Sequence, residues 1–187
     1  MKTKPISKNG GVESIMSPNT LPSALIQNLI ENYRSSQLTA INSGLDMNDA
    51  HSIWFDLPTL KKFIADVEAE TQNVNPEVTE NDLGIRFYYA AYPSTENWNI
   101  MENQPIGQEY AGKHTLVLVP TMKKANEEGE MLDYDFNPLN SGTNLRSNVS
   151  LMLSLESADD EPQSEDNALA QNHGQLIPPA STVVQMY

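Results

Sequence analysis

The chain has 187 residues and no cysteine, and this absence excludes several classes of protein at once. Disulfide scaffolds, thiolate zinc sites, iron–sulfur clusters and cysteine nucleophiles all need the missing side chain. There is also no apolar run of the length that crosses a bilayer, about 20 residues. No apolar run follows Lys2, Lys4 and Lys8, so we expect no secretory signal peptide and a cytoplasmic location.

Positive charge is scarce, with 11 Lys and Arg against 25 Asp and Glu and a formal net charge of −14. A surface of this kind repels the phosphates of nucleic acids and of anionic lipids. We therefore expect no nucleic-acid partner and no membrane partner. The charge favours a basic protein partner, although acidity also serves solubility alone.

Composition divides the chain into three parts. Residues 1–19 are rich in Lys, Ser, Gly, Asn and Pro without any periodicity, which predicts a flexible N-terminal arm. Residues 20–140 carry the periodic segments and are predicted to form a single domain. Residues 141–187 are predicted to be an acidic, largely flexible C-terminal tail, because the run 156–166 has six carboxylates and no positive charge. The end of this tail, 173–187, is apolar enough to dock on the domain.

Residues 20–35 have the spacing of an amphipathic helix. Apolar residues recur every three or four positions: Leu21, Leu25, Ile26, Leu29, Ile30 and Tyr33. Thr20 can cap the first turn, and Pro22 falls where its missing N–H does no harm, so we predict a helix that ends near Ser35. Gln37–Ile41 fits either a short strand or a continuation of the helix.

A second helix is predicted to follow the short β-prone run Ser52–Phe55. The carboxylate of Asp56 can accept hydrogen bonds from the first turn and so cap the helix. One apolar stripe follows at helical spacing: Leu57, Leu60, Phe63, Ile64 and Val67. The helix should end before Asn73–Pro76, since proline disfavours helical geometry in the preceding residue.

Two strands are predicted from period-two alternation. Residues 84–92 carry apolar or aromatic groups on both faces, which indicates a central strand covered on both sides. Residues 114–121 have the same two-sided pattern, with Pro120 closing the strand. Residues 131–139 are predicted to form a strand at the sheet edge. The sequence therefore predicts an α+β fold, with a small mixed or antiparallel sheet of three to five strands and two main helices packed on one face.

Four segments resemble those of small uncharacterised bacterial proteins with the same segment order: HSIWFDLPTLKKFI, GIRFYYAAYP, HTLVLVPT and NHGQLIPP. The resemblance covers roughly the middle half of the chain and the tail segment. It implies an independently folding bacterial domain, and no activity or catalytic residue carries over from it.

A candidate ligand site comes from the predicted strands. Arg86, Tyr88 and Tyr92 share one strand face, and His114 lies near its end if the two strands are neighbours. A guanidinium, two phenols and an imidazole can bind a carboxylate or phosphate, or stack on a planar ligand. The interpretation that we favour is packing, with Arg86 paired to a helix carboxylate and the tyrosines covering the sheet.

Two tryptophans are candidate interface residues, because tryptophan is prominent in binding energetics. Trp54 and Phe55 point in opposite directions if 52–55 is extended, so one of them belongs to the core and the other can serve as a surface anchor. Trp98 lies in a polar loop, where a partner surface and an intramolecular pocket explain it equally well.

Asp133, Asp135 and Asn137 form the candidate metal site, since alternate acidic side chains can converge on a hard cation. Pro138 follows where an EF-hand loop needs glycine. Alternate acids on an edge strand also protect it from pairing, and this explanation is the one we favour. None of the three histidines belongs to a spaced ligand pair, so we predict no zinc site and no cofactor.

No complete catalytic constellation is visible in the sequence. We therefore expect a non-catalytic protein-binding or accessory module. One alternative is an acidic inhibitor or immunity-type protein that neutralises a basic partner. Another is a small enzyme or ligand-binding domain that acts on an anionic small molecule through Arg86 and His114, or on a metal-bound one through Asp133 and Asp135.

Overall fold

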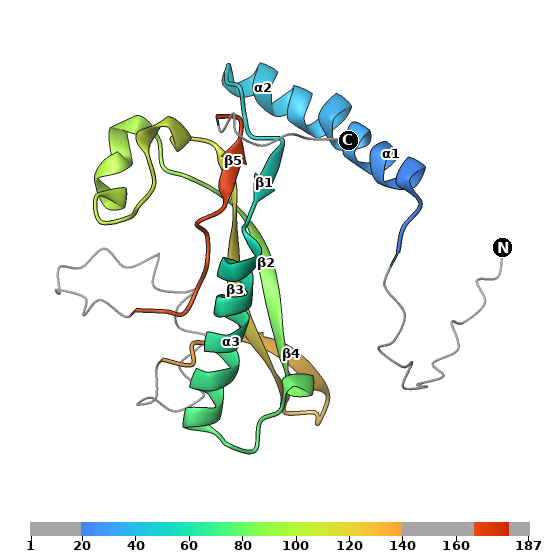
Figure 1. Cartoon of the computed structure of the whole chain (residues 1–187), viewed down its shortest axis with the longest axis vertical. Helices are drawn as coiled ribbons and strands as arrows, with labels where there is room; N and C mark the ends of the chain where they lie inside the picture. The colour runs from blue at the N-terminus through green and yellow to red at the C-terminus, as the bar shows by residue number, and fades with distance from the viewer. Residues whose placement is uncertain (1–19, 140–166, 180–187) are drawn as a thin grey trace.

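The computed structural model describes residues 20–139 and 167–179, which form helices and two antiparallel sheets (Figure 1). The predicted α+β class and the antiparallel pairing are confirmed. The predicted arm at 1–19 and most of the predicted tail lie outside the described residues. The division into one domain and two flexible ends therefore stays a prediction.

The first helical region is one long rod rather than a helix that ends near Ser35. It consists of α1 (Ser23–Tyr33), a π-helical segment (Arg34–Leu38) and α2 (Thr39–Leu45). The helix continues through Ser35, whose hydroxyl donates to the carbonyl oxygen of Glu31 at 2.7 Å. The segment 37–41, which the sequence left open, thus continues the helix.

The helix α3 (Leu57–Val74) begins where the sequence predicts. Asp56 Oδ1 accepts from the backbone N–H of Thr59 at 2.7 Å, and the Thr59 hydroxyl donates to Oδ2 at the same distance. Its buried face is narrower than predicted, because Leu57 and Ile64 stay exposed. The residues buried in α3 are Phe63, Val67 and Thr71, each four positions from the next.

Replacing Asp56 with alanine should lower the melting temperature by a few degrees, whereas asparagine should preserve most of the stability. Hydrogen bonds from the Thr59 side chain and then from its backbone lower the pKa of Asp56 below the ordinary 3.8. A lowered folded-state pKa stabilises fully above the ordinary value and is lost as the pH falls through the folded value. Thermal unfolding from neutral pH downward should show the alanine deficit shrinking in acid; a deficit independent of pH would contradict the capping role.

The larger sheet has the order β2-β3-β4, formed by β2 (Leu83–Ala91), β3 (His114–Ala125) and β4 (Met131–Asp135). The prediction that 84–92 is a central strand is wrong, because β3 lies in the centre and β2 at the edge. Aromatic residues on both faces of β2 do not mean two covered faces here: Phe87 is 54% exposed and Tyr89 is 91% exposed.

Proline at position 120 does not end β3, contrary to the prediction, and the strand continues to Ala125. Pro120 lies opposite Ile85, and its carbonyl oxygen accepts from the N–H of Phe136 at 3.0 Å. The backbone groups of Pro120 point away from β2, toward the side of β3 on which β4 lies. The pairing of β3 with β4 starts one residue later, at Thr121. The missing N–H therefore removes no hydrogen bond from the ladder.

The described C-terminal segment, 167–179, is docked on the domain. Gln171 exchanges two backbone hydrogen bonds with Leu118, at 2.8 and 3.1 Å. Farther along, β5 (Gln175–Ile177) pairs antiparallel with β1 (Ser52–Trp54) and makes a separate two-stranded sheet. The segment thereby joins the central strand of the larger sheet to the smaller sheet.

Two apolar clusters hold these parts together. One lies between α3 and the larger sheet and contains Phe63, Val67 and Leu118. The other contains Ala50, Tyr92 and Leu176, with half-buried aromatic and aliphatic groups around them. Within residues 20–139 and 167–179, no helix has both the length and the apolar character to cross a membrane.

Candidate functional site

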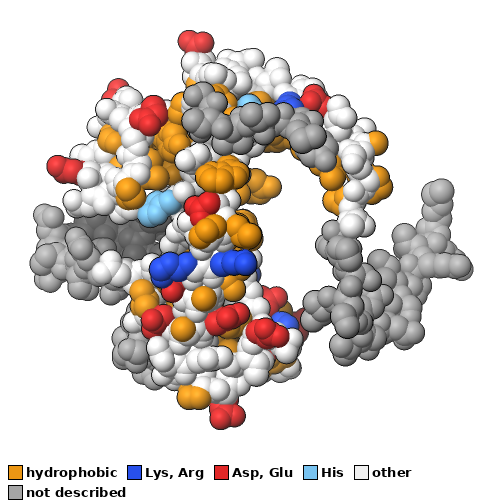
Figure 2. Space-filling model, in the orientation of Figure 1, with side chains coloured by type: hydrophobic (Ala, Val, Ile, Leu, Met, Phe, Trp, Pro, Cys, Tyr) orange, Lys and Arg blue, Asp and Glu red, His pale blue; other side chains and the backbone are white. Residues whose placement is uncertain are grey.

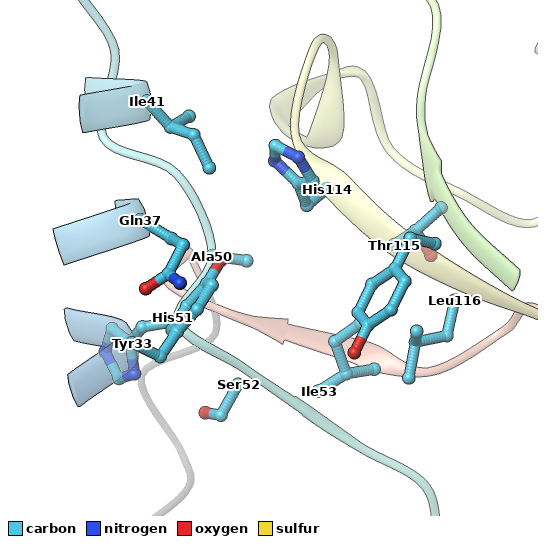
Figure 3. Close-up of a pocket in the computed structure, with 11 residues that line it drawn as sticks. Tyr33, Gln37, Ile41, Ala50, His51, Ser52, Ile53, His114, Thr115 and Leu116 are labelled. Carbon is cyan, nitrogen blue, oxygen red and sulfur yellow. The ribbon is translucent and has the colours of Figure 1, made fainter. Parts of the chain in front are cut away.

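A cavity of about 500 Å³ lies between the helical rod and the adjacent ends of the sheets (Figure 3). We call it the helix–sheet cavity. It is lined by Tyr33, Gln37 and Ile41 of the rod, by 50–53 around β1, and by Tyr89 and 114–116 of the larger sheet. In Figure 3 the rod residues lie on one side and His114, Thr115 and Leu116 on the other. Its walls therefore come from three separate parts of the chain.

A fully buried carboxylate, Asp49, connects two parts of the cavity wall, the segment before β1 and the start of β3, through hydrogen bonds. Its Oδ1 accepts from the backbone N–H groups of Ala50 and His114, both at 2.8 Å, and its Oδ2 bonds to Nδ1 of the His114 ring. An ionised carboxylate only accepts hydrogen bonds, so Nδ1 of His114 carries the proton. In the neutral imidazole Nε2 is then an acceptor that remains for another group.

His51 contributes a half-buried imidazole to the same wall. Its Nδ1 is buried and finds no hydrogen-bond partner within the part of the chain that the structure describes. Burial and then the charge of Arg34 lower the pKa of His51 below its usual 6.5. The ring is therefore neutral at neutral pH, and it forms an uncharged part of the cavity.

The phenol of Tyr33 is held in its protonated form. Burial first, and then Asp49 and Tyr89, raise the pKa of Tyr33 above its usual 10.0. Asp49 thus acts on this phenol as a negative charge, as Arg34 acts on His51 as a positive one. The helix–sheet cavity thus combines apolar walls with neutral hydrogen-bonding groups.

The structure does not bring the four predicted ligand residues together. Arg86 forms an ion pair with Asp135, and its Nη2 donates to the carbonyl oxygen of Asp133 at 2.8 Å. The Tyr88 hydroxyl donates to the same Asp135 carboxylate. The favoured alternative, a paired arginine, thus matches the contacts, although the carboxylate comes from β4 and not from a helix.

Tyr92 and His114 lie in two other environments. Tyr92 is buried against Trp98 and Tyr110, with ring centroids 6.3 and 5.8 Å away, and its hydroxyl donates to the carbonyl oxygen of Asn172 at 3.2 Å. It belongs to the core. Of the four residues, His114 alone lines the helix–sheet cavity.

Asp135 and Asn137, two of the candidate metal residues, form hydrogen bonds or ion pairs with other segments of the chain. Asp135 is engaged by Arg86 and Tyr88, and the side chain of Asn137 bonds to the backbone of Asn167 and Leu169, at 2.9 and 3.2 Å. Over residues 20–139 and 167–179, no three acidic or histidine side chains gather in a way that could hold a metal ion.

The two candidate interface tryptophans differ in environment. Trp54 on β1 is exposed, whereas the adjacent Phe55 packs in the cluster under α3. Trp98 lies in a 3₁₀ helix (Thr95–Met101), half-buried against Tyr92. An intramolecular pocket thus supports Trp98, and Trp54 is the tryptophan that presents an exposed side chain.

The feature that sequence reasoning missed is the outer edge of β2. The backbone groups of Leu118 bond to Gln171 and therefore point away from β2. In an antiparallel ladder, successive residues of a strand direct their backbone groups to opposite sides. The neighbours Val117 and Val119 are therefore the residues whose backbone groups bond to β2. These lie opposite Tyr88 and Arg86. The backbone N–H and C=O groups of Phe87 and Tyr89 consequently point outward, along with those of the other odd-numbered residues of β2.

The helical rod also carries exposed apolar side chains. Leu25 and Leu29 on α1 are exposed, as is Leu21 just before it, and no residue of α1 is buried. Figure 2 shows an open space between the rod and the sheet, with hydrophobic side chains on both sides of it. The helix–sheet cavity lies where the two surfaces converge, since Tyr33 and Tyr89 both line it.

No family model matches the chain, and no match was found among the curated proteins or the solved structures. The geometry of the described residues is therefore the basis for a functional proposal.

Proposed function

We propose that the chain is a non-catalytic protein-binding module of the bacterial cytoplasm that takes an extended segment of a partner protein along the outer edge of β2. The observation that carries this proposal is the coincidence of two features on the same residues. Phe87 and Tyr89 expose both their aromatic rings and their outward backbone groups. An added strand would use the backbone groups for pairing and the rings for side-chain contacts.

The chemistry of this edge supports binding rather than permanent exposure. Proteins usually protect edge strands with lysine, proline, bulges or short length, since unpaired edges pair with other chains. The outer edge of β2 instead spans nine residues and presents two aromatic rings. Burying one such ring stabilises a complex by about 1.5–3 kcal/mol.

The net charge of −14 favours a basic partner. Opposite charges accelerate association, and salt screens this effect. The role of an acidic inhibitor or immunity-type protein is compatible with the same mode of binding, because it too requires a basic partner. Association should therefore slow as the ionic strength rises.

Site-specific photo-crosslinking in the native cell tests the proposal. We expect p-benzoylphenylalanine placed at position 87 to cross-link one defined partner, and the same residue placed at Leu132, exposed on β4 at the opposite edge of the sheet, to cross-link none. Equal cross-linking at both positions, or none at 87 in a folded protein, would refute binding at the edge of β2.

A matched pair of substitutions isolates the backbone contribution. Tyr89→Thr keeps the outward N–H, and Tyr89→Pro removes it while sparing the hydrogen bonds between β2 and β3. We expect the cross-link at position 87 to be lost in the proline variant and retained in the threonine variant, with both proteins folded by circular dichroism. Identical cross-linking in the two variants would argue against strand addition.

A further inference from the structure

We propose that the helix–sheet cavity is the specificity pocket of this edge, and that it takes a tyrosine or tryptophan side chain of the bound segment. This assignment rests on the proposed function, because it names the chemistry that the partner must carry. The ligand class is an aromatic ring with a single O–H or N–H donor and no negative charge.

The position of the cavity connects it to the outer edge of β2. Tyr89 belongs to both, since its backbone groups point outward and its side chain lines the cavity. A residue paired with an edge strand projects its side chain on the same face as its partner. The side chain opposite or diagonal to Tyr89 would therefore enter the space between Tyr89 and Tyr33.

The size and the walls of the cavity suit an aromatic ring. A volume of about 500 Å³ lies within the range of small-ligand pockets, about 300–1,000 Å³. Ile41, Ile53 and Leu116 supply aliphatic walls, and the two tyrosines supply aromatic ones. A buried aromatic side chain gains most of its binding energy from contacts of this kind.

The hydrogen-bonding groups select a donor on that ring. His114 lines the cavity with a side chain that is 37% exposed, and its Nδ1 bonds to Asp49, so that Nε2 is the acceptor in the neutral form of the ring. The other imidazole, His51, has a buried Nδ1. A phenol or indole supplies the donor that Nε2 of His114 can accept, and an ionised carboxylate has no such donor.

Small fragments test the pocket directly. We expect p-cresol and 3-methylindole, the side-chain analogues of tyrosine and tryptophan, to shift the NMR signals of the His114 ring and the Ile53 methyl groups with about millimolar dissociation constants. p-Xylene, which lacks the donor, should bind about 5- to 10-fold more weakly than p-cresol, since one hydrogen bond is lost. p-Toluate should not bind. Equal affinity for p-xylene and p-cresol would overturn the proposed selectivity.

A cavity-filling variant shows that binding occurs at this place. Gln37 is exposed and lines the cavity, so Gln37→Trp should abolish fragment binding without removing a buried contact. Gln27→Trp, on the same rod and outside the cavity, is the matched control and should bind p-cresol like the wild type. Unchanged binding in Gln37→Trp would overturn the assignment.

Cross-linking separates failure of this inference from failure of the proposed function. Mass spectrometry of the partner captured at position 87 should find tyrosine or tryptophan within two residues of the cross-linked site. A captured partner with neither residue would refute the pocket assignment and leave strand addition in place. Selective fragment binding without any captured partner would instead refute the proposed function, and it would assign the cavity to a free aromatic molecule.

Discussion

Replacing Asp49 with alanine should lower the free energy of unfolding by about 3–5 kcal/mol, one of the largest effects expected of a single substitution in this chain. The carboxylate is 0% exposed and accepts hydrogen bonds from the N–H groups of Ala50 and His114 and from the His114 ring. Alanine would remove the acceptor that all three donors share at a buried position. Urea unfolding followed by circular dichroism measures the loss.

A substitution of an exposed carboxylate serves as the control for Asp49→Ala. Asp66→Ala removes an exposed carboxylate that pairs with Lys62 on the surface of α3, and it should change stability by less than about 0.5 kcal/mol. A loss at Asp49 no larger than this would contradict the structural role of the buried carboxylate.

Asparagine at position 49 keeps one acceptor and replaces the other with a donor. Stability should fall less than with alanine, and the His114 ring should move its proton from Nδ1 to Nε2 so that Nδ1 can accept. Imidazole nitrogen chemical shifts report this change of tautomer. Binding of p-cresol should weaken with it, because Nε2 would then carry a proton and no longer accept a hydrogen bond.

The elements predicted well from the sequence are those whose causes are local. Asp56 caps α3 through a bond to Thr59, three residues away, and the stripe that contains Phe63 and Val67 faces the sheet. The strands at 84–92 and 114–121 also form where their alternation predicts them, although 84–92 lies at the edge of the sheet and the second strand continues to Ala125. Local physics sufficed for these features because neither capping nor periodicity depends on distant parts of the chain.

Contacts between residues far apart in the chain could not be predicted from the sequence. Asp49 and His114 are 65 residues apart, and nothing in the polar segment around Asp49 marks it as buried. The exposure of Phe87 and Tyr89 depends on which part of the sheet face α3 covers, and a pattern within one strand does not carry that information. Arg86 was placed on the correct strand, but its partner Asp135 lies 49 residues away.

The contrast between local patterns and long-range contacts also explains why only part of the candidate site was predicted. His114 was selected for its place at the end of a strand face, and it does line the helix–sheet cavity. The groups that give its ring a defined tautomer and an apolar surrounding come from the rod and from the segment before β1. A cavity assembled from three parts of the chain leaves no spacing pattern in any one of them.

Replacing Leu176 with alanine should destabilise the protein by about 3 kcal/mol, although the residue follows an acidic segment that composition assigns to a flexible tail. Its side chain is 0% exposed and packs with Ala50 and Tyr92, so truncation leaves a cavity in the second cluster. Leu132→Ala on β4 removes the same atoms from an exposed position and should cost less than about 1 kcal/mol. Equal losses in urea unfolding would contradict the docking of the C-terminal segment.

The effect of Leu176→Ala should also reach the helix–sheet cavity. β5 pairs with β1, and the backbone N–H of His51 donates to the carbonyl oxygen of Ile177 at 2.8 Å, so the cavity wall at 50–53 rests on this segment. Hydrogen exchange at the amides of Ser52–Trp54 should therefore accelerate more than exchange within α3. Uniform acceleration across the fold would show that the segment stabilises the whole domain and does not support the cavity wall in particular.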